Sequence, residues 1–199
     1  MKTLINFLSA FRIAVSFLII PTLMEKWYWL AFILYTLGAI SDWFDGYLAR
    51  KHNCCSKLGG VLDHIGDKFL VCNTFIMLAL IAPIWTVVIP VIIMIARELY
   101  VSGLREFLGT QKIEMPVPKA RFSMGKIKTT FQMIAIAVFL LFFAILSSIT
   151  PATDSRIVFY LITNLPKAGV FCLWFALVMS VWSATQYTFT FAQKLKKIK

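Results

Sequence analysis

Four aspartates lie in the short stretch from Asp42 to Asp67 of a chain that is otherwise strongly apolar. The whole sequence has only nine acidic residues, so this concentration of carboxylates needs an explanation. Asp42 and Asp45 are three residues apart, and Asp63 and Asp67 are four residues apart. On helices, each pair would lie on one face, one turn apart. Two helices could therefore present all four carboxylates to one point.

Carboxylates without a matching set of thiolates or imidazoles favour a hard divalent cation, Mg²⁺ or Mn²⁺. Two such ions close together would stabilise an in-line displacement at phosphorus. The chemistry that these residues predict is therefore metal-assisted transfer of a phosphorus-containing group.

Composition predicts that the elements holding the aspartates are membrane helices. The chain has 199 residues, of which 60% are hydrophobic and 15% charged, and runs of nearly 20 apolar residues recur along it. A soluble core does not require such runs, so we expect a polytopic all-α membrane protein with one domain over residues 1–199. The net charge of +11 could indicate nucleic-acid binding, but the basic residues cluster beside apolar runs, as in loops that face anionic lipid. We therefore expect no nucleic-acid partner.

The apolar pattern predicts six transmembrane helices. A short interfacial helix over residues 1–11 precedes them, with Leu4, Leu8 and Phe11 on one side. The predicted spans cover about 12–24, 27–50, 60–81, 85–104, 127–147 and 167–193. The first acidic pair then lies in the last third of the second span, and the other pair in the first two turns of the third. Both pairs are expected near the same membrane face, at headgroup depth.

The loops predict the orientation of these spans. One side collects most of the basic residues: Lys2, Arg50, Lys51, Lys57, Arg105, Lys112, Lys119, Arg121, Lys126, Lys128 and the four lysines of the C-terminal tail. The other side has little beyond Lys26, Arg156 and Lys167. By the positive-inside rule, both termini and the acidic pairs face the cytoplasm.

An aspartate at the centre of a lipid-facing helix costs roughly 2.5–3.5 kcal/mol, so the four should line a polar cavity. The alternative to a metal site is that they form buried ion pairs with Arg50, Lys68 or Arg97. Ion pairing does not explain why both pairs have helical spacing at one depth, which favours the metal site.

The complete pattern resembles the signature of the CDP-alcohol phosphotransferases: Asp42-x-x-Asp45-Gly46-x-x-Ala49-Arg50, eight residues, then Gly59-x-x-x-Asp63-x-x-x-Asp67. The resemblance implies a homodimer of six-helix subunits in which four aspartates hold two divalent ions, Mg²⁺ or Mn²⁺, against the pyrophosphate of a CDP-linked lipid. Its metal ligands would be Asp42, Asp45, Asp63 and Asp67. Asp67 would also be the catalytic base, and the residues that bind CDP would be Gly46, Arg50, Ser56 and Gly59.

One departure from the family concerns the second half of the motif. Many members read Asp-Pro-x-Ala-Asp-Lys, whereas this chain reads Asp63-His64-Ile65-Gly66-Asp67-Lys68. No metal ligand is lost. His64 follows Asp63 directly and so points elsewhere on a helix, which makes it a neighbour of the site rather than its base.

Residues 95–109 (IARELYVSGLREFLG) and 125–133 (GKIKTTFQM) resemble the phosphatidylglycerolphosphate synthases of bacteria in particular, as does Asn6-x-x-Ser9-x-x-Arg12. The acceptor there is sn-glycerol 3-phosphate, a dianion that needs a basic pocket beside the metals. The candidates for that pocket are Arg97, Arg105, Lys119, Arg121, Lys126 and Lys128. We prefer Arg105 and Lys126, then Lys119 and Arg121. Most of these basic residues are explained equally well if they only set the orientation of the helices in the membrane.

The resemblance implies an enzyme of the bacterial cytoplasmic (inner) membrane, with membrane lipid around it. It would join CDP-diacylglycerol to sn-glycerol 3-phosphate and release phosphatidylglycerol phosphate and CMP. One alternative is the same chemistry with another acceptor, such as inositol phosphate, serine or phosphatidylglycerol. A membrane prenyltransferase and a cation transporter without enzymatic activity are further alternatives. Metal-dependent release of CMP would exclude the transporter, and competition between acceptors separates members of the family.

Overall fold

The protein is a bundle of long α-helices. The computed structural model describes residues 2–52, 57–110, 124–149 and 156–195, and within these ranges the side chains of 7–41, 61, 65–107, 109–110, 127–149 and 156–194. The described residues form six helices and no strand: α1 (Lys2–Met24), α2 (Tyr28–His52), α3 (Lys57–Ile81), α4 (Trp85–Thr110), α5 (Met124–Ser147) and α6 (Arg156–Leu195). The predicted all-helical architecture is confirmed.

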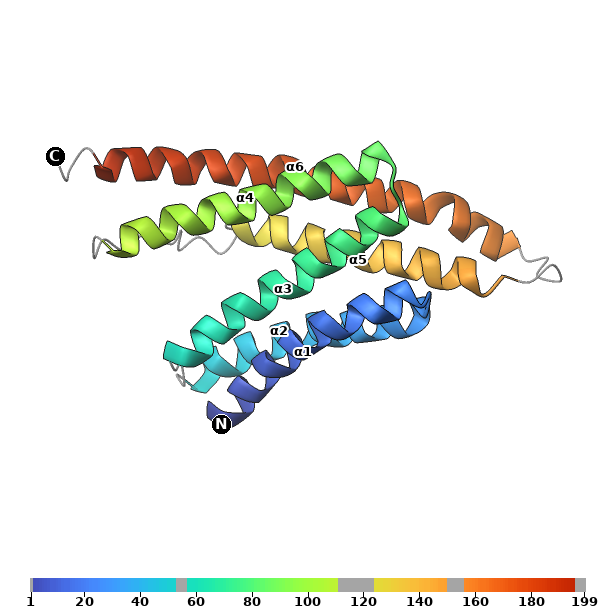
Figure 1. Ribbon diagram of the computed structural model, residues 1–199, viewed down its shortest axis with the longest axis horizontal. Coiled ribbons are helices and arrows are strands. Elements are labelled where there is room, and N and C mark those ends of the chain that lie inside the picture. The colour runs from blue at the N-terminus through green and yellow to red at the C-terminus, as the bar shows by residue number, and fades with distance from the viewer. Residues whose placement is uncertain (1, 53–56, 111–123, 150–155, 196–199) are drawn as a thin grey trace.

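Successive helices run in opposite directions (Figure 1). The start of α1, the end of α2, the start of α3, the end of α4, the start of α5 and the end of α6 therefore lie at one end of the bundle. α3 is central, because it contacts α1, α2, α4 and α5, while α6 packs along α4 and α5. This arrangement brings the acidic parts of α2 and α3 to the same end as both ends of the helical chain.

Four helices are long and apolar enough to cross a membrane, counting only the described residues. They cover Phe7–Met24, Trp85–Phe107, Ile127–Ser147 and Arg156–Lys194. α2 is apolar over Tyr28–Ser41, and its remaining part carries the first acidic pair. α3 carries the second pair and two lysines. The protein is therefore a membrane protein by length and composition, and the count of six spans remains a prediction.

Helix boundaries differ most from the predicted ones in α1, α4 and α6, and α4 ends at Thr110 rather than at 104. α1 runs without a break from Lys2 to Met24, so the structure does not confirm a separate interfacial helix that ends at residue 11. α6 begins at Arg156 rather than near Lys167, and Pro166 lies inside it. Proline ends helices in water, but a membrane helix tolerates it because neighbouring groups satisfy the freed carbonyls.

The turn between α1 and α2 was predicted at Glu25-Lys26, and it closes α1 with a Schellman motif. Lys26 has a positive φ of 60°. The Trp27 amide donates to the Thr22 carbonyl at 2.8 Å, and the Lys26 amide donates to the Leu23 carbonyl at 3.2 Å. The last carbonyls of α1 are thereby satisfied without water, which suits a turn at a membrane surface.

All six helices contribute to one apolar core. It includes Ile19, Tyr35, Leu70, Met94, Ile136 and Leu173, each nearly inaccessible to solvent. Hydroxyl groups inside the bundle donate to carbonyls of their own helix, as Thr74 does to Leu70 and Thr22 does to Ile19. Internal pairing of this kind is required where no water is present.

Candidate active site

The acidic pairs lie on two helices that contact each other. Asp42 and Asp45 are within α2, and Asp63 and Asp67 are within α3, so both pairs have the helical spacing that was predicted. α2 and α3 pack together, and the end of α2 lies beside the start of α3 (Figure 1). A set of carboxylates alone, on two helices that meet, fits a hard divalent cation.

Most of the other predicted site residues can be placed only by their backbone. Gly46, Arg50, Gly59 and Lys126 lie in helices α2, α2, α3 and α5. Their surroundings, and the side chains of Asp42, Asp45 and Asp63, lie outside the described residues. Ser56, Lys119 and Arg121 also lie outside them. The roles assigned to these residues remain predictions.

Asp67 is the predicted metal ligand whose side chain is described. Arg12 Nη1 of α1 donates to Asp67 Oδ1 at 2.8 Å. Arg12 is completely buried, whereas the Asp67 side chain is 32% exposed. The guanidinium therefore approaches the carboxylate from inside the bundle, while the carboxylate itself remains accessible.

Close packing of α1 against α3 makes this ion pair possible. Gly66 precedes Asp67, and a Cβ at Gly66 would lie 3.4 Å from the Ser9 carbonyl oxygen and 3.5 Å from Arg12 Cδ. The two helices remain together deeper in the bundle, where Asn73 donates to the Ser16 carbonyl at 3.3 Å. Residue 66 therefore lies in van der Waals contact with α1 at the level of Ser9 and Arg12, which places α1 within reach of the carboxylate on α3.

A second charged cluster lies on the other side of α3, among α4, α5 and α6. Arg97 and Lys128 are both buried, and both bond to Glu98 Oε1. Arg97 also donates to the Ser180 carbonyl at 3.1 Å and to Ser183 Oγ at 2.9 Å, which ties α4 to α6. Two buried cations thus share one carboxylate, and the cluster has an excess of positive charge.

The positive charge extends from this cluster toward the C-terminal end of α4. Lys68, the residue after Asp67, donates to Ser102 Oγ, and Ser102 donates to the Glu98 carbonyl at 2.8 Å. Arg105 lies one turn beyond Ser102 and is exposed. It donates to the Tyr187 hydroxyl at 2.7 Å, and its guanidinium lies 4.9 Å from the centre of that ring.

These contacts bear on the alternative in which the aspartates form buried ion pairs with Lys68 or Arg97. Arg97 pairs with Glu98, and Lys68 bonds to a serine, so the described contacts of these two predicted partners go to other groups. Arg12 meets Asp67, and sequence reasoning named Arg12 only within the Asn6-x-x-Ser9-x-x-Arg12 resemblance, without assigning it a contact. Its signal was a charged residue in an otherwise apolar run, Phe7–Met24.

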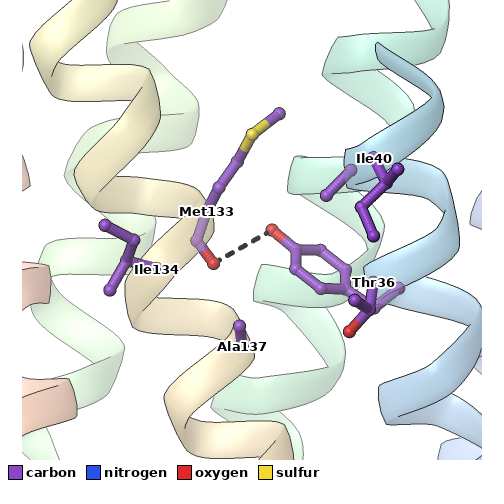
Figure 2. Close-up of a pocket in the computed structure, with 7 residues that line it drawn as sticks. Thr36, Ile40, Met133, Ile134 and Ala137 are labelled. Atoms are coloured by element: carbon purple, nitrogen blue, oxygen red, sulfur yellow. Dashed lines mark hydrogen bonds between the residues drawn. The ribbon is translucent and has the colours of Figure 1, made fainter. Parts of the chain in front are cut away.

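An apolar groove lies between α2 and α5, with a volume of about 300 Å³. Thr36, Ile40, Met133, Ile134 and Ala137 line it (Figure 2). Tyr35 also lines it and donates to the Met133 carbonyl at 3.4 Å. Ile40 precedes Asp42 by two residues, so the groove begins about 3 Å from the first acidic residue along the axis of α2.

Comparison with known proteins supports the interpretation of this arrangement. The family model for CDP-alcohol phosphatidyltransferase matches residues 2–182. A CDP-diacylglycerol–glycerol-3-phosphate 3-phosphatidyltransferase of Rickettsia typhi is 38% identical over 71% of this chain and 78% of its own length. Proteins with the same name are 32% identical in Pectobacterium atrosepticum, over 90% of each chain, and 28% identical in Blochmanniella floridana, over 97% of this chain and 93% of the relative. The protein is therefore an enzyme of the CDP-alcohol phosphatidyltransferase family.

Proposed function

We propose that this enzyme transfers the phosphatidyl group of CDP-diacylglycerol to sn-glycerol 3-phosphate, giving phosphatidylglycerol phosphate and CMP. The observation that carries the proposal is that carboxylates lie on one side of α3 and a cluster of cations lies on the other. The accessible carboxylate of Asp67 belongs to the acidic set, and the adjacent Lys68 begins a cluster of cations on α4 and α5. The names of the bacterial relatives support both substrates.

The acidic side of α3 is proposed to receive the donor. Two divalent cations, Mg²⁺ or Mn²⁺, held by Asp42, Asp45, Asp63 and Asp67 would neutralise charge on the pyrophosphate. Asp67 accepts the proton of the glycerol hydroxyl, whose oxygen bonds to the lipid-side phosphorus. The bond from this phosphorus to the bridging oxygen breaks, and CMP leaves with that oxygen. In such a transfer the protein contributes mainly orientation and electrostatic stabilisation.

The cationic side is proposed to receive the acceptor. Lys68, Arg97 and Lys128 carry three positive charges against the single negative charge of Glu98. A phosphate dianion would offset this excess and would be oriented by charge-assisted hydrogen bonds. The predicted acceptor residues Arg105, Lys126, Lys119 and Arg121 remain part of the proposal. Arg105 is supported by its exposed position one turn beyond Ser102.

The donor lipid is proposed to extend from the acidic end of α2 along the groove between α2 and α5. Gly46, Arg50, Ser56 and Gly59 would hold the CDP group. One acyl chain would then enter the groove, whose lining is almost entirely apolar and which begins within one turn of Asp42. Burial of each CH₂ group contributes about 0.8 kcal/mol, so a groove of this kind favours a lipid donor over a soluble nucleotide.

The proposed setting is the cytoplasmic membrane of a bacterium. All six helices would cross it, the enzyme would be a homodimer, and both termini and the site would face the cytoplasm. The common end of the bundle that holds the acidic helices is also the end with most of the basic residues, which supports this orientation.

The test is release of CMP from CDP-diacylglycerol by the purified protein with Mg²⁺, with and without glycerol 3-phosphate. We expect release that depends on both the metal and the acceptor. Release with serine or inositol phosphate in place of glycerol 3-phosphate would overturn the proposed acceptor. No release with any alcohol would overturn the reaction itself.

A further inference from the structure

We infer that Arg12 is a positioning residue for Asp67: it holds one oxygen of this carboxylate so that the other face stays directed toward the substrates. The inference rests on the proposed function, in which Asp67 takes the proton of the acceptor. It concerns α1, a helix that contributes no aspartate to the acidic set.

The two partners of the ion pair differ in burial, and this difference suits a role for Arg12 in positioning Asp67. The Arg12 side chain has no exposed surface, so it is held by the packing between α1 and α3. Asp67 keeps 32% of its side chain exposed, and its Oδ1 lies 2.8 Å from Arg12 Nη1. A fixed donor thus bonds to an accessible acceptor, which restrains rotation of the carboxylate and leaves its exposed surface available.

The neighbouring contacts fix the position of Arg12 itself. Gly66 lies against α1 at the level of Ser9 and Arg12, where a Cβ would be in van der Waals contact with the Ser9 carbonyl oxygen and Arg12 Cδ. One turn deeper, the rings of Phe17 and Phe69 pack with their centres 5.5 Å apart. α1 therefore contacts α3 on both sides of the ion pair. These contacts fix the position of the guanidinium along the axis of α3, next to Asp67.

Charge provides a second reason for a cation at this place. Asp67 is one of four aspartates on two helices that pack together. Like charges at close range repel and drive side chains apart. A buried guanidinium on the protein side of Asp67 counteracts that repulsion before a substrate arrives, and it does so from a direction that does not block the site.

A simple structural ion pair would also join α1 to α3, so the test must separate the two roles. Arg12→Met keeps an unbranched, largely apolar stem that is shorter than arginine, and it removes the donor. Because Asp67 is partly exposed, this change does not leave a buried carboxylate without solvent, and we expect the variant to fold. Asn73→Leu is the matched control, since it removes a described polar contact between α3 and α1, at Ser16, without touching Asp67.

The experiment measures kcat and KM for CMP release, together with binding of CDP-diacylglycerol by calorimetry and the melting temperature of each purified variant. We expect Arg12→Met to lower kcat at least tenfold, while donor binding changes less than threefold. Arg12→Lys should recover part of kcat, because it restores a cationic donor. Asn73→Leu should lower the melting temperature and keep kcat within twofold of the wild-type value.

Two results would overturn the inference. One is a wild-type kcat in Arg12→Met, and the other is an equal loss of kcat in Arg12→Met and Asn73→Leu, which would mean that α1 only stabilises α3. The readout is CMP, which every alcohol acceptor releases. A mistaken choice of acceptor would therefore appear in the wild-type enzyme and would not be confused with failure of the Arg12 inference.

Discussion

The contacts of Glu98 distinguish a cation that holds helices together from cations that could bind a substrate anion. Its Oε1 accepts from both Arg97 and Lys128, which are buried cations on different helices. Arg97 makes two described bonds that connect α4 to α6, and a third to Glu98 on its own helix, so it contributes to the structure whether or not a substrate is present. Lys128 and the exposed Arg105 have fewer such bonds and are better placed to respond to an anion.

At the residue scale, the first prediction concerns the acidic set. Asp63→Ala should abolish CMP release, because it removes a carboxylate that is proposed to hold the divalent ions. The variant should still insert and purify, since the change leaves the apolar part of α3 unaltered. Activity at saturating Mg²⁺ and the elution profile of the purified protein check the two statements. Near-normal turnover would falsify the proposed metal site.

A second prediction at this scale concerns the acceptor. Arg105→Ala should raise KM for glycerol 3-phosphate roughly ten- to a hundredfold, because a hydrogen bond to a charged group contributes about 1.5–3 kcal/mol. KM for CDP-diacylglycerol should change little. Initial rates with each substrate varied in turn measure both constants.

The control for the acceptor prediction is Arg156→Ala. Arg156 is also exposed, but it begins α6 at the opposite end of the bundle. Both constants should be unchanged in this variant. An unaltered KM for glycerol 3-phosphate in Arg105→Ala would move the acceptor pocket toward Lys126, Lys119 or Arg121.

At the scale of elements, α2 has two different functions along its length. Its first part, Tyr28–Ser41, is apolar and packs against α5, with the groove on the side where Thr36 and Ile40 face Met133 and Ala137 (Figure 2). Its last part carries Asp42, Asp45 and Arg50. One helix therefore presents an apolar surface for a lipid chain and, within a turn, the carboxylates proposed to act at its headgroup.

The groove leads to a prediction about donor chain length. Ala137→Trp fills it and should raise KM for a long-chain CDP-diacylglycerol about tenfold, because displacing even two CH₂ groups loses about 1.6 kcal/mol of burial. A short-chain donor that does not reach Ala137 should be affected much less. Kinetics with the two donors in the same detergent check the difference.

Ala96→Trp provides the matched control for the groove. Ala96 is exposed on α4, away from α2 and α5, so the same increase in size should leave KM for both donors unchanged. If Ala137→Trp affects the long and short donors equally, the groove does not hold the acyl chain, and a general change in packing is the explanation.

At the scale of the whole molecule, the alternation of the six helices puts the acidic ends of α2 and α3 beside the start of α1 and the end of α6 (Figure 1). The turn at Glu25 lies at the other end. Glycerol 3-phosphate is a soluble dianion, so the end that holds the site must face the compartment that supplies it. Under the proposed function this compartment is the cytoplasm, and the distribution of basic residues in the sequence predicts the same orientation by the positive-inside rule.

Topology can be tested by labelling in intact cells. The background is a variant without the native cysteines Cys54, Cys55, Cys72 and Cys172. An impermeant maleimide added outside spheroplasts should label Glu25→Cys and not Lys57→Cys, whereas both should be labelled after the membrane is opened. Labelling of Lys57→Cys from outside would contradict the cytoplasmic site.

Much of the site could be predicted before any tertiary contact was known, because helical periodicity is local. The spacing of Asp42 and Asp45, and of Asp63 and Asp67, depends only on 3.6 residues per turn, and both pairs are helical in the structure. The cost of a carboxylate in lipid predicts that the four aspartates lie in a polar site near one membrane face. Apolar runs likewise predicted the helices, apart from the early start of α6, where Pro166 does not interrupt a helix supported by its neighbours.

Which cation meets which anion could not be predicted in this way. Arg12 and Asp67 are 55 residues apart, and their contact exists because α1 packs closely against α3. Arg97 and Lys68, which by sequence were equally good partners for the aspartates, are directed to Glu98 and Ser102 by the packing of α3, α4 and α5. The composition of the sequence and its helical periodicity determined which charged residues each helix carries. The partner of each charge was decided by the tertiary structure, because a salt bridge of a few ångströms depends on how closely and at what height two helices pack.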